Sequence, residues 1–210
     1  MLRLDSREAG FSEAFAALLA MKREVSEDVD AQVRAIIADV RARGDAALAE
    51  YTLRFDRVDV SGALEISAAE RAAARSRCGP EALAALELAA ERIRAFHERQ
   101  KPADMLFRDA LGVELGWRWS AVESAGLYVP GGSASYPSSV LMNAIPARVA
   151  GVERLVMVVP TPDGALDPLV LAAADIAGVD TIYRIGGAQA IAALAYGTQT
   201  IAPVAKIVGP

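Results

Sequence analysis

The chain has few of the residues that usually carry catalysis or bind metals: its 210 residues include one cysteine, Cys78, and one histidine, His97. A single cysteine excludes an intramolecular disulfide framework and is typical of a reducing compartment. One histidine and one cysteine cannot form a His/Cys metal cluster. Glutamates and aspartates are plentiful, but their spacing places none beside a partner. We expect His97 to lie on or pack against a helix surface, and Cys78 to pack rather than react.

Long apolar runs and concentrated positive charge are also missing. No apolar run approaches the roughly 18 residues that a membrane span needs, and the N-terminal MLRLDSREAG lacks the apolar core of a signal peptide. The formal net charge is −5, and no run of Lys and Arg is typical of a phosphate-backbone surface. The composition, 53% hydrophobic and 23% charged, is ordinary for a globular protein. We expect a cytoplasmic protein that binds neither nucleic acid nor a membrane.

The first hundred residues have the periodicity of successive helices. Apolar residues recur at helical spacing over residues 29–40, and Gly44 follows as a helix C-cap. Asp45 is then expected to cap a second helix. The inner face of that helix carries three apolar side chains: Leu48, Tyr51 and Phe55.

Two more helices follow an interruption, RVDVSGALEIS, which could hold one or two brief extended pieces. Ser67 and Glu70 have the S-x-x-E spacing of a capping box, which predicts a helix start. Pro80 suits the first turn of the next helix, and Pro102 ends it.

The period changes after Pro102. Four apolar residues alternate with polar residues or glycine, which predicts a half-buried strand: Val113, Leu115, Trp117 and Trp119. Both tryptophans share one face of it, so we interpret them as core or interface packing rather than as an aromatic binding platform.

From Ala125 onward, short apolar runs alternate with helical segments at about 138–149, 167–177 and 188–196. This alternation predicts an α/β fold with an open, mostly parallel sheet that carries helices on its faces. Right-handed crossovers place the carboxyl ends of all the strands at one edge. Four loops should therefore line one crevice: residues 128–132, 160–164, 186–189 and 209–210.

The first of these loops combines glycines with serines. Pro130, Gly131 and Gly132 precede four serines, and glycines let a phosphate or nucleotide approach the main chain. The loop matches neither G-x-G-x-x-G nor a P-loop, because no lysine follows the glycines. Tyr128, at the strand end, could stack on a ligand ring or be a partly buried strand residue. A tight turn with helix caps explains the segment equally well.

The second loop places Gly186 and Gly187 before Gln189 at the start of a helix. An amide there could contact a ligand, although a surface glutamine is the simpler interpretation. Because both loops open on the same edge, their combination favours a binding crevice more than either does alone.

Three stretches together resemble the histidinol dehydrogenase family: GLYVPGGSASYPSSVLMNAIPA, VERLVMVVPTPDG and TIYRIGGAQAIAALAYGTQTIAPVAKIVGP. The helical half is similar too, so the resemblance covers the whole chain, as an N-terminal portion of the family's length. It implies an N-terminal helical segment, residues 1–110, and a Rossmann-like NAD-side domain, residues 111–210, truncated at its C-terminal end. The implied fold is an incomplete Rossmann-like sheet of the aldehyde-dehydrogenase-like class.

The resemblance also implies the reaction. Members oxidise L-histidinol via L-histidinal to L-histidine with two NAD and a zinc ion, and they form homodimers. Tyr128 and Gln189 match the family's NAD contacts, with Pro130, Gly131 and Gly132 beside them. The zinc ligands and the catalytic Glu–His pair correspond to positions beyond Pro210, so no catalytic residue and no metal ligand is expected in this chain, and the isolated chain is expected to be inactive.

Two alternatives remain open. The chain could be a stand-alone nucleotide-binding or assembly module, since it has no catalytic His or Cys. A dehydrogenase with the aldehyde-dehydrogenase mechanism is disfavoured, because Cys78 lies among the N-terminal helices and not in the half that would carry a nucleophile. If the chain is part of a longer enzyme, apolar surface meant for the rest should be bare and should promote self-association.

Overall fold

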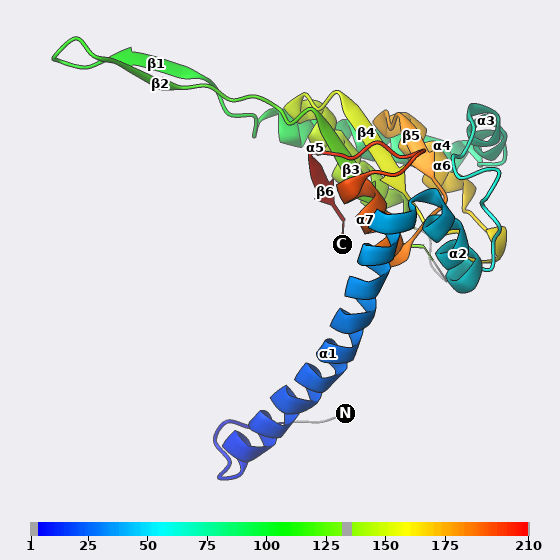
Figure 1. Cartoon of the computed structure of the whole chain (residues 1–210). Coiled ribbons are helices and arrows are strands. Elements are labelled where there is room, and N and C mark those ends of the chain that lie inside the picture. Colours follow the sequence, from blue (N-terminus) through cyan, green and yellow to red (C-terminus); the bar gives the residue numbers. More distant parts are fainter. Residues whose placement is uncertain (1–3, 132–135, 210) are drawn as a thin grey trace.

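The computed structural model describes residues 4–131 and 136–209 and has a parallel sheet between layers of helices (Figure 1). The strands of this sheet are β3 (Ser124–Tyr128), β4 (Arg154–Val158), β5 (Thr181–Tyr183) and β6 (Lys206–Val208). The helices are α1 (Phe11–Arg43), α2 (Asp45–Asp56), α3 (Ala68–Ser76), α4 (Pro80–Glu98), α5 (Pro137–Ala150), α6 (Pro168–Ala177) and α7 (Gly187–Tyr196), with a 3-10 turn, η1 (Pro162–Gly164). A separate hairpin consists of β1 (Met105–Arg108) and β2 (Glu114–Trp117). The predicted α/β fold is confirmed.

The order of the main sheet is β5-β4-β3-β6, and each described pairing in it is parallel. Successive residues of a strand point to opposite faces, so each strand contributes to two cores. Leu127, Leu155 and Met157 belong to the core on one face. Val156 and Val158 belong to the core on the other face. This sharing explains why the strands are nearly continuous apolar runs in the sequence.

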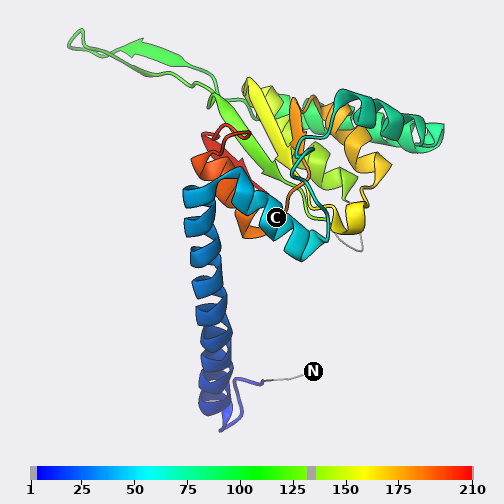
Figure 2. The ribbon, with the colours of Figure 1, turned by 45° about the vertical axis from the view of Figure 1, so that its right-hand side comes forward.

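Helices cover both faces of the sheet (Figures 1 and 2). On one face α5 and α6 pack on the strands, and α3 and α4 pack on those two helices. On the other face lies α7, against which α2 and the C-terminal part of α1 pack. The N-terminal part of α1 stands away from the sheet in both views. The predicted division of the chain at residues 110 and 111 stays a prediction.

The edge of the sheet at β5 is covered by an N-terminal segment. Ile66 donates its N–H to the Ile182 carbonyl, and Arg184 donates its N–H to the Leu64 carbonyl. Glu65 and Tyr183 form an isolated antiparallel bridge between these bonds. The brief extended pieces expected in RVDVSGALEIS are present in the structure as this bridge. At the opposite edge, β6 pairs with β3 alone among the described residues.

The helix ends follow the sequence pattern in most places. Gly44 ends α1 with φ of +59°, and Pro80 opens α4. Asp45 is not the N-cap of α2, because the helix begins at Asp45 itself and Gly44 takes the cap position. The Asp45 carboxylate accepts a bond from the Thr200 hydroxyl instead, at 2.6 Å. The expected inner face is also only partly right, since Leu48 is buried and Phe55 is exposed.

The predicted capping box at Ser67 and Glu70 is present, with both reciprocal bonds. Glu70 also accepts a bond from Arg184, at 2.6 Å. The Arg184 guanidinium and then the Ser67 donors hold the pKa of Glu70 at about 2, below its usual 4.5.

This shift predicts a pH dependence of stability. Because the folded-state pKa of Glu70 is lowered, its carboxylate stabilises the fold above pH 4.5, and this contribution is lost as the pH falls towards 2. We expect Glu70→Gln to lower the free energy of unfolding at pH 7 by about 1 kcal/mol or less, since solvent screens a half-exposed pair. Urea unfolding at pH 7 and pH 3 measures the difference, which should shrink at the lower pH. An equal loss at both values would contradict this origin.

The hairpin of β1 and β2 stands away from the body of the molecule (Figure 1). Its register pairs Met105 with Trp117 and Phe107 with Leu115, which puts these four apolar side chains on one face. Each of them is between 45% and 50% exposed. The predicted strand is present at β2, but the predicted half-burial is wrong within this chain, because no described element packs on the apolar face.

His97 and Cys78, the histidine and the cysteine of the N-terminal half, both make packing contacts. His97, on α4, packs edge-on against Phe96, with ring centroids 5.2 Å apart. Cys78 is half-buried and free, and its thiol lies 3.5 Å from the Ala74 carbonyl. Among the helices that the structure describes, none combines the length and the apolar character needed to cross a membrane.

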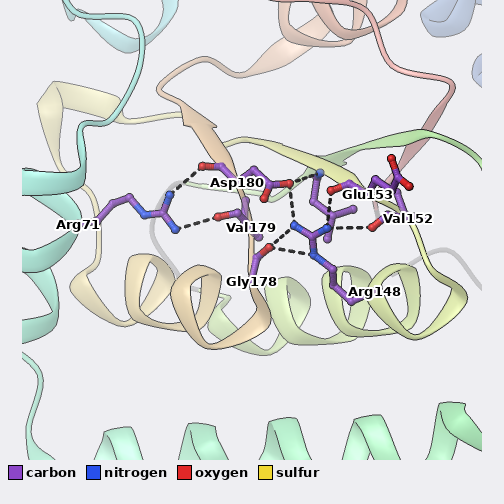
Figure 3. Close-up of polar contacts among 8 residues, drawn as sticks. Arg71, Arg148, Val152, Glu153, Gly178, Val179 and Asp180 are labelled. Atoms are coloured by element: carbon purple, nitrogen blue, oxygen red, sulfur yellow. Dashed lines mark hydrogen bonds and ion pairs between the residues drawn. The ribbon is translucent and has the colours of Figure 1, made fainter.

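Two arginines hold the turn between α6 and β5 (Figure 3). Arg148, from α5, donates to the carbonyls of Gly178, Val152 and Glu153 and to the Asp180 carboxylate. Arg71, from α3, reaches the same turn from the other side and donates to the carbonyls of Val179 and Asp180. Positive charge at the carboxyl end of α6 is favourable to its dipole, and the bonds join three helices at one turn.

Candidate functional site

The order of the strands defines where a ligand should bind. The chain passes from β3 to β4 on one side and adds β6 on the other side of β3, so the topological switch point lies between β3 and β6. Ligands of open α/β sheets bind outside the carboxyl ends of the strands at this point. The structure has a cavity of about 380 Å³ there. Its lining consists of Tyr128, Gly187, Ile191, Ile207, Val208 and Gly209.

Tyr128 connects the two predicted loops. It is the last residue of β3, and its hydroxyl accepts a hydrogen bond from the N–H of Gly187 at 3.1 Å. The bond fixes the tyrosine against the first residue of α7, so the hydroxyl satisfies one of the free N–H groups at that helix end. Stacking of the ring on a ligand stays a prediction, and the half-buried ring does line the cavity.

Gln189 lies at the third position of α7 and is 2% exposed, so the simpler expectation of a surface glutamine is wrong. Its Oε1 is buried and has no hydrogen-bond partner among the described residues. This oxygen lies beside Gly187, where a Cβ would come within 2.7 Å of it, and Gly187 has φ of +66°. A buried acceptor without a donor is unfavourable, which makes Oε1 a candidate contact for a ligand that carries a donor.

Pro160 lies between the two glycine loops. A Cβ at Gly131 would come within 2.6 Å of the Pro160 carbonyl oxygen, and a Cβ at Gly186 within 2.4 Å of the Pro160 side chain. Both glycines are therefore required for close packing of three strand ends, whatever else they bind. Pro130 is half-buried next to them. Gly132, with Ser133 and Ser135, lies outside the described residues, so its predicted contact stays a prediction.

The four loops expected in one crevice divide between two cavities. Tyr128, Gly187 and Gly209 line the cavity at the switch point. Thr161 and Gly164 line a different cavity, beside α3 and α6. Sequence reasoning also missed Ile191, Ile207 and Val208 in the lining, because apolar residues of a helix and a strand carry no sign in the sequence of the side on which a cavity lies.

Among the described residues, none that lines the switch-point cavity has a charged side chain. Hydrogen bonding there comes from the amino end of α7, the Tyr128 hydroxyl and, next to the lining, the Gln189 amide. The helix end favours an anionic group, and Gln189 Oε1 favours a donor. A ligand with phosphates and with hydroxyl or amide donors fits this set. For a metal ion, the described residues contain no group of three or more His, Cys, Asp or Glu side chains close enough to bind one.

An open parallel sheet, with helices on both faces and a cavity at its switch point, defines a Rossmann-like α/β protein. A family model described as histidinol dehydrogenase matches residues 19–210. The chain belongs to the histidinol dehydrogenase family, as its resemblance predicted.

Individual relatives agree. The chain is 65% identical over 210 residues to a histidinol dehydrogenase of Mesorhizobium japonicum and 67% identical over 208 residues to one of Ruegeria pomeroyi. It also matches the crystal structure of histidinol dehydrogenase from Elizabethkingia anophelis with a TM-score of 0.83 and 34% identity, over 87% of this chain and 42% of that one. The chain spans about half the length of the curated relatives, 49% and 48% for the two named here.

Proposed function

We propose that this chain supplies the NAD-binding side of a histidinol dehydrogenase, which oxidises L-histidinol via L-histidinal to L-histidine. The observation that carries the proposal is the contact between Tyr128 and the first residue of α7 at the switch point, with the unsatisfied Gln189 oxygen beside it. Membership of the histidinol dehydrogenase family supports the same function. NAD, when bound, accepts the hydride that leaves the carbinol carbon of L-histidinol.

Each side chain of the site has a separate part in this proposal. Tyr128 keeps the amino end of α7 in place, so that this end can receive an anionic group of the cofactor. Gln189 Oε1 accepts a hydrogen bond from a hydroxyl or amide of the cofactor. This bond removes the energetic cost of a buried acceptor without a partner. Gly131 and Gly186 let the strand ends pack closely against Pro160. The acid–base groups and the zinc site of the reaction belong to residues that this chain does not contain.

The test of the proposal pairs the chain with the part of the Mesorhizobium japonicum relative that it does not match. We expect the co-expressed pair to form NADH when L-histidinol is added, and the 210-residue chain alone to form none. NADH formation by the chain alone would contradict the assignment of the acid–base groups elsewhere. A pair that assembles and binds NAD without turning over L-histidinol would contradict the proposed activity.

A stand-alone nucleotide-binding module is the second candidate. Neither candidate requires a metal-binding cluster in this chain, so the described residues, which contain none, do not separate the two. The same pairing experiment separates the two, because a module would gain no dehydrogenase activity from its complement.

We also propose that the protein acts as a homodimer in the cytoplasm. The single cysteine supports a reducing compartment. The apolar face of the hairpin supports association, because large apolar side chains at alternate positions along it are exposed: Met105, Phe107, Val113, Leu115, Trp117 and Trp119.

The hairpin leads to a prediction about self-association. The double substitution Leu115→Ser and Trp117→Ser should shift the 210-residue chain towards the monomer, because it removes two apolar side chains from an exposed face. Sedimentation velocity over a range of concentrations measures the shift. Leu88→Ser, at an exposed position of α4, should leave the distribution unchanged. A wild-type chain that is monomeric at all concentrations tested would contradict the prediction.

A further inference from the structure

A second cavity opens at the same edge of the sheet, at the carboxyl ends of β4 and β5. It has a volume of about 610 Å³ and lies between α3, the amino end of α6 and the two strand ends. None of its lining residues lines the cavity at the switch point. The polar side chains of its lining are Glu70, Arg77, Thr161, Asp167 and Arg184.

Two polar atoms of this lining are buried without a hydrogen-bond partner in the described part of the chain. Thr161, which follows the end of β4, is 3% exposed, and its Oγ1 has no partner. Arg184, which follows β5 directly, has a buried Nε without a partner. A guanidinium nitrogen can only donate, and a hydroxyl can donate as well as accept. Each atom can therefore be satisfied by an acceptor that a ligand brings into the cavity.

Carboxylates repel an anion, but those of this cavity already accept hydrogen bonds from other groups, which weakens the repulsion. Glu70 is already bonded to Arg184 and to Ser67, and Asp167 accepts the N–H of Leu169 as the N-cap of α6. Asp56 lies behind Thr161 and accepts its backbone N–H at 3.3 Å, and burial raises the pKa of this carboxyl. Arg77 lines the cavity and has no ion pair among the described contacts, and the ten-residue α6 directs its amino end to the same space.

We propose that this cavity binds a small oxyanion, a phosphate or carboxylate group, between Thr161 Oγ1 and Arg184 Nε, with Arg77 at its rim. The lining of this site shares no residue with that of the cavity at the switch point. The oxyanion has two possible sources, free phosphate or a phosphate group of a dinucleotide that lies along the sheet edge.

The test is a titration of the 210-residue chain with inorganic phosphate at constant ionic strength, followed by ¹⁵N NMR of the Arg184 Nε–H and the Thr161 amide. We expect saturable shifts of both signals. Thr161→Val should raise the phosphate Kd about tenfold, because a hydrogen bond to a charged group is lost, and Arg184→Lys should do the same by removing the Nε donor while keeping the charge. Thr161→Ser, which keeps the hydroxyl, should bind like the wild type.

Arg57→Lys is the matched control, since it makes the same replacement in an exposed ion pair with Asp163 on the neighbouring turn. It should change Kd by less than about twofold, as expected for a screened surface charge. Shifts that do not saturate, or an unchanged Kd in both Thr161→Val and Arg184→Lys, would mean an adventitious ion only and would overturn the proposal.

A second titration in the presence of saturating NAD identifies the source. Loss of phosphate binding assigns the site to a phosphate group of the dinucleotide, and unchanged binding assigns it to free phosphate. If NAD does not bind at all while phosphate still saturates the site, the proposed NAD-binding function fails and the oxyanion site stands.

Discussion

Replacement of Arg148 by methionine is expected to lower the free energy of unfolding by about 3 kcal/mol, because it removes the donor of partly buried carbonyls and one of two donors to the Asp180 carboxylate. The guanidinium donates to three carbonyls and to Asp180, and its side chain is 22% exposed. For a domain of this size, the loss corresponds to a fall in Tm of roughly 10 °C. Urea unfolding and calorimetry measure the two quantities.

Arg75→Met provides the matched control. Arg75 forms one ion pair, with Glu87, and both side chains are well exposed. Its loss should change the free energy of unfolding by less than about 0.5 kcal/mol. Similar effects of the two substitutions would show that the turn between α6 and β5 does not depend on Arg148.

Gln189→Leu is expected to change stability and binding in opposite directions. Leucine removes a buried acceptor that has no partner in the described chain, so the free energy of unfolding should rise by about 1 kcal/mol. The same change removes the proposed contact with the cofactor, so the Kd for NAD should rise at least about tenfold. Urea unfolding and calorimetric titration with NAD provide the two readings.

Gln100→Leu, the same change at an exposed position beyond α4, should alter neither quantity. If Gln189→Leu weakened the fold and left NAD binding unchanged, the amide would have a structural role that the described contacts do not contain.

Local rules were sufficient for much of the fold. The helices after Ala125 begin and end within one residue of their predicted bounds, because proline, glycine and the apolar period act within a few residues of each position. The capping box at Ser67 is of the same kind, since both partners lie within one helical turn.

The wrong predictions concern positions whose structure depends on residues far away in the sequence. Asp45 is a good helix cap by its own chemistry, yet its carboxylate and its N–H are taken by Thr200 and Gln199, more than 150 positions away. The burial of Gln189 is another case, because it depends on how α7 packs against the rest of the fold. The alternating pattern of the hairpin correctly indicated one apolar face, but alternation does not specify what covers that face.

The candidate site was predictable in position and less so in detail. Tyr128, Gly187 and Gly209 meet because parallel strands share one edge, which follows from the order of elements in the sequence. That Thr161 lies in another cavity could not be foreseen, since it depends on where α3 packs against α6.

Because the edge of the sheet at β5 is covered, a further strand can be added only at the β6 edge. Residues 64–66 occupy the free hydrogen-bonding groups of β5, so a further strand cannot join on that side. At the other side, β6 pairs only with β3 among the described residues, and its end forms part of the switch-point cavity. Any strand that extends this sheet, from the same molecule or another, must therefore pair with β6, beside the ligand site. The binding or loss of such a strand would change the surroundings of Gly209 and Tyr128.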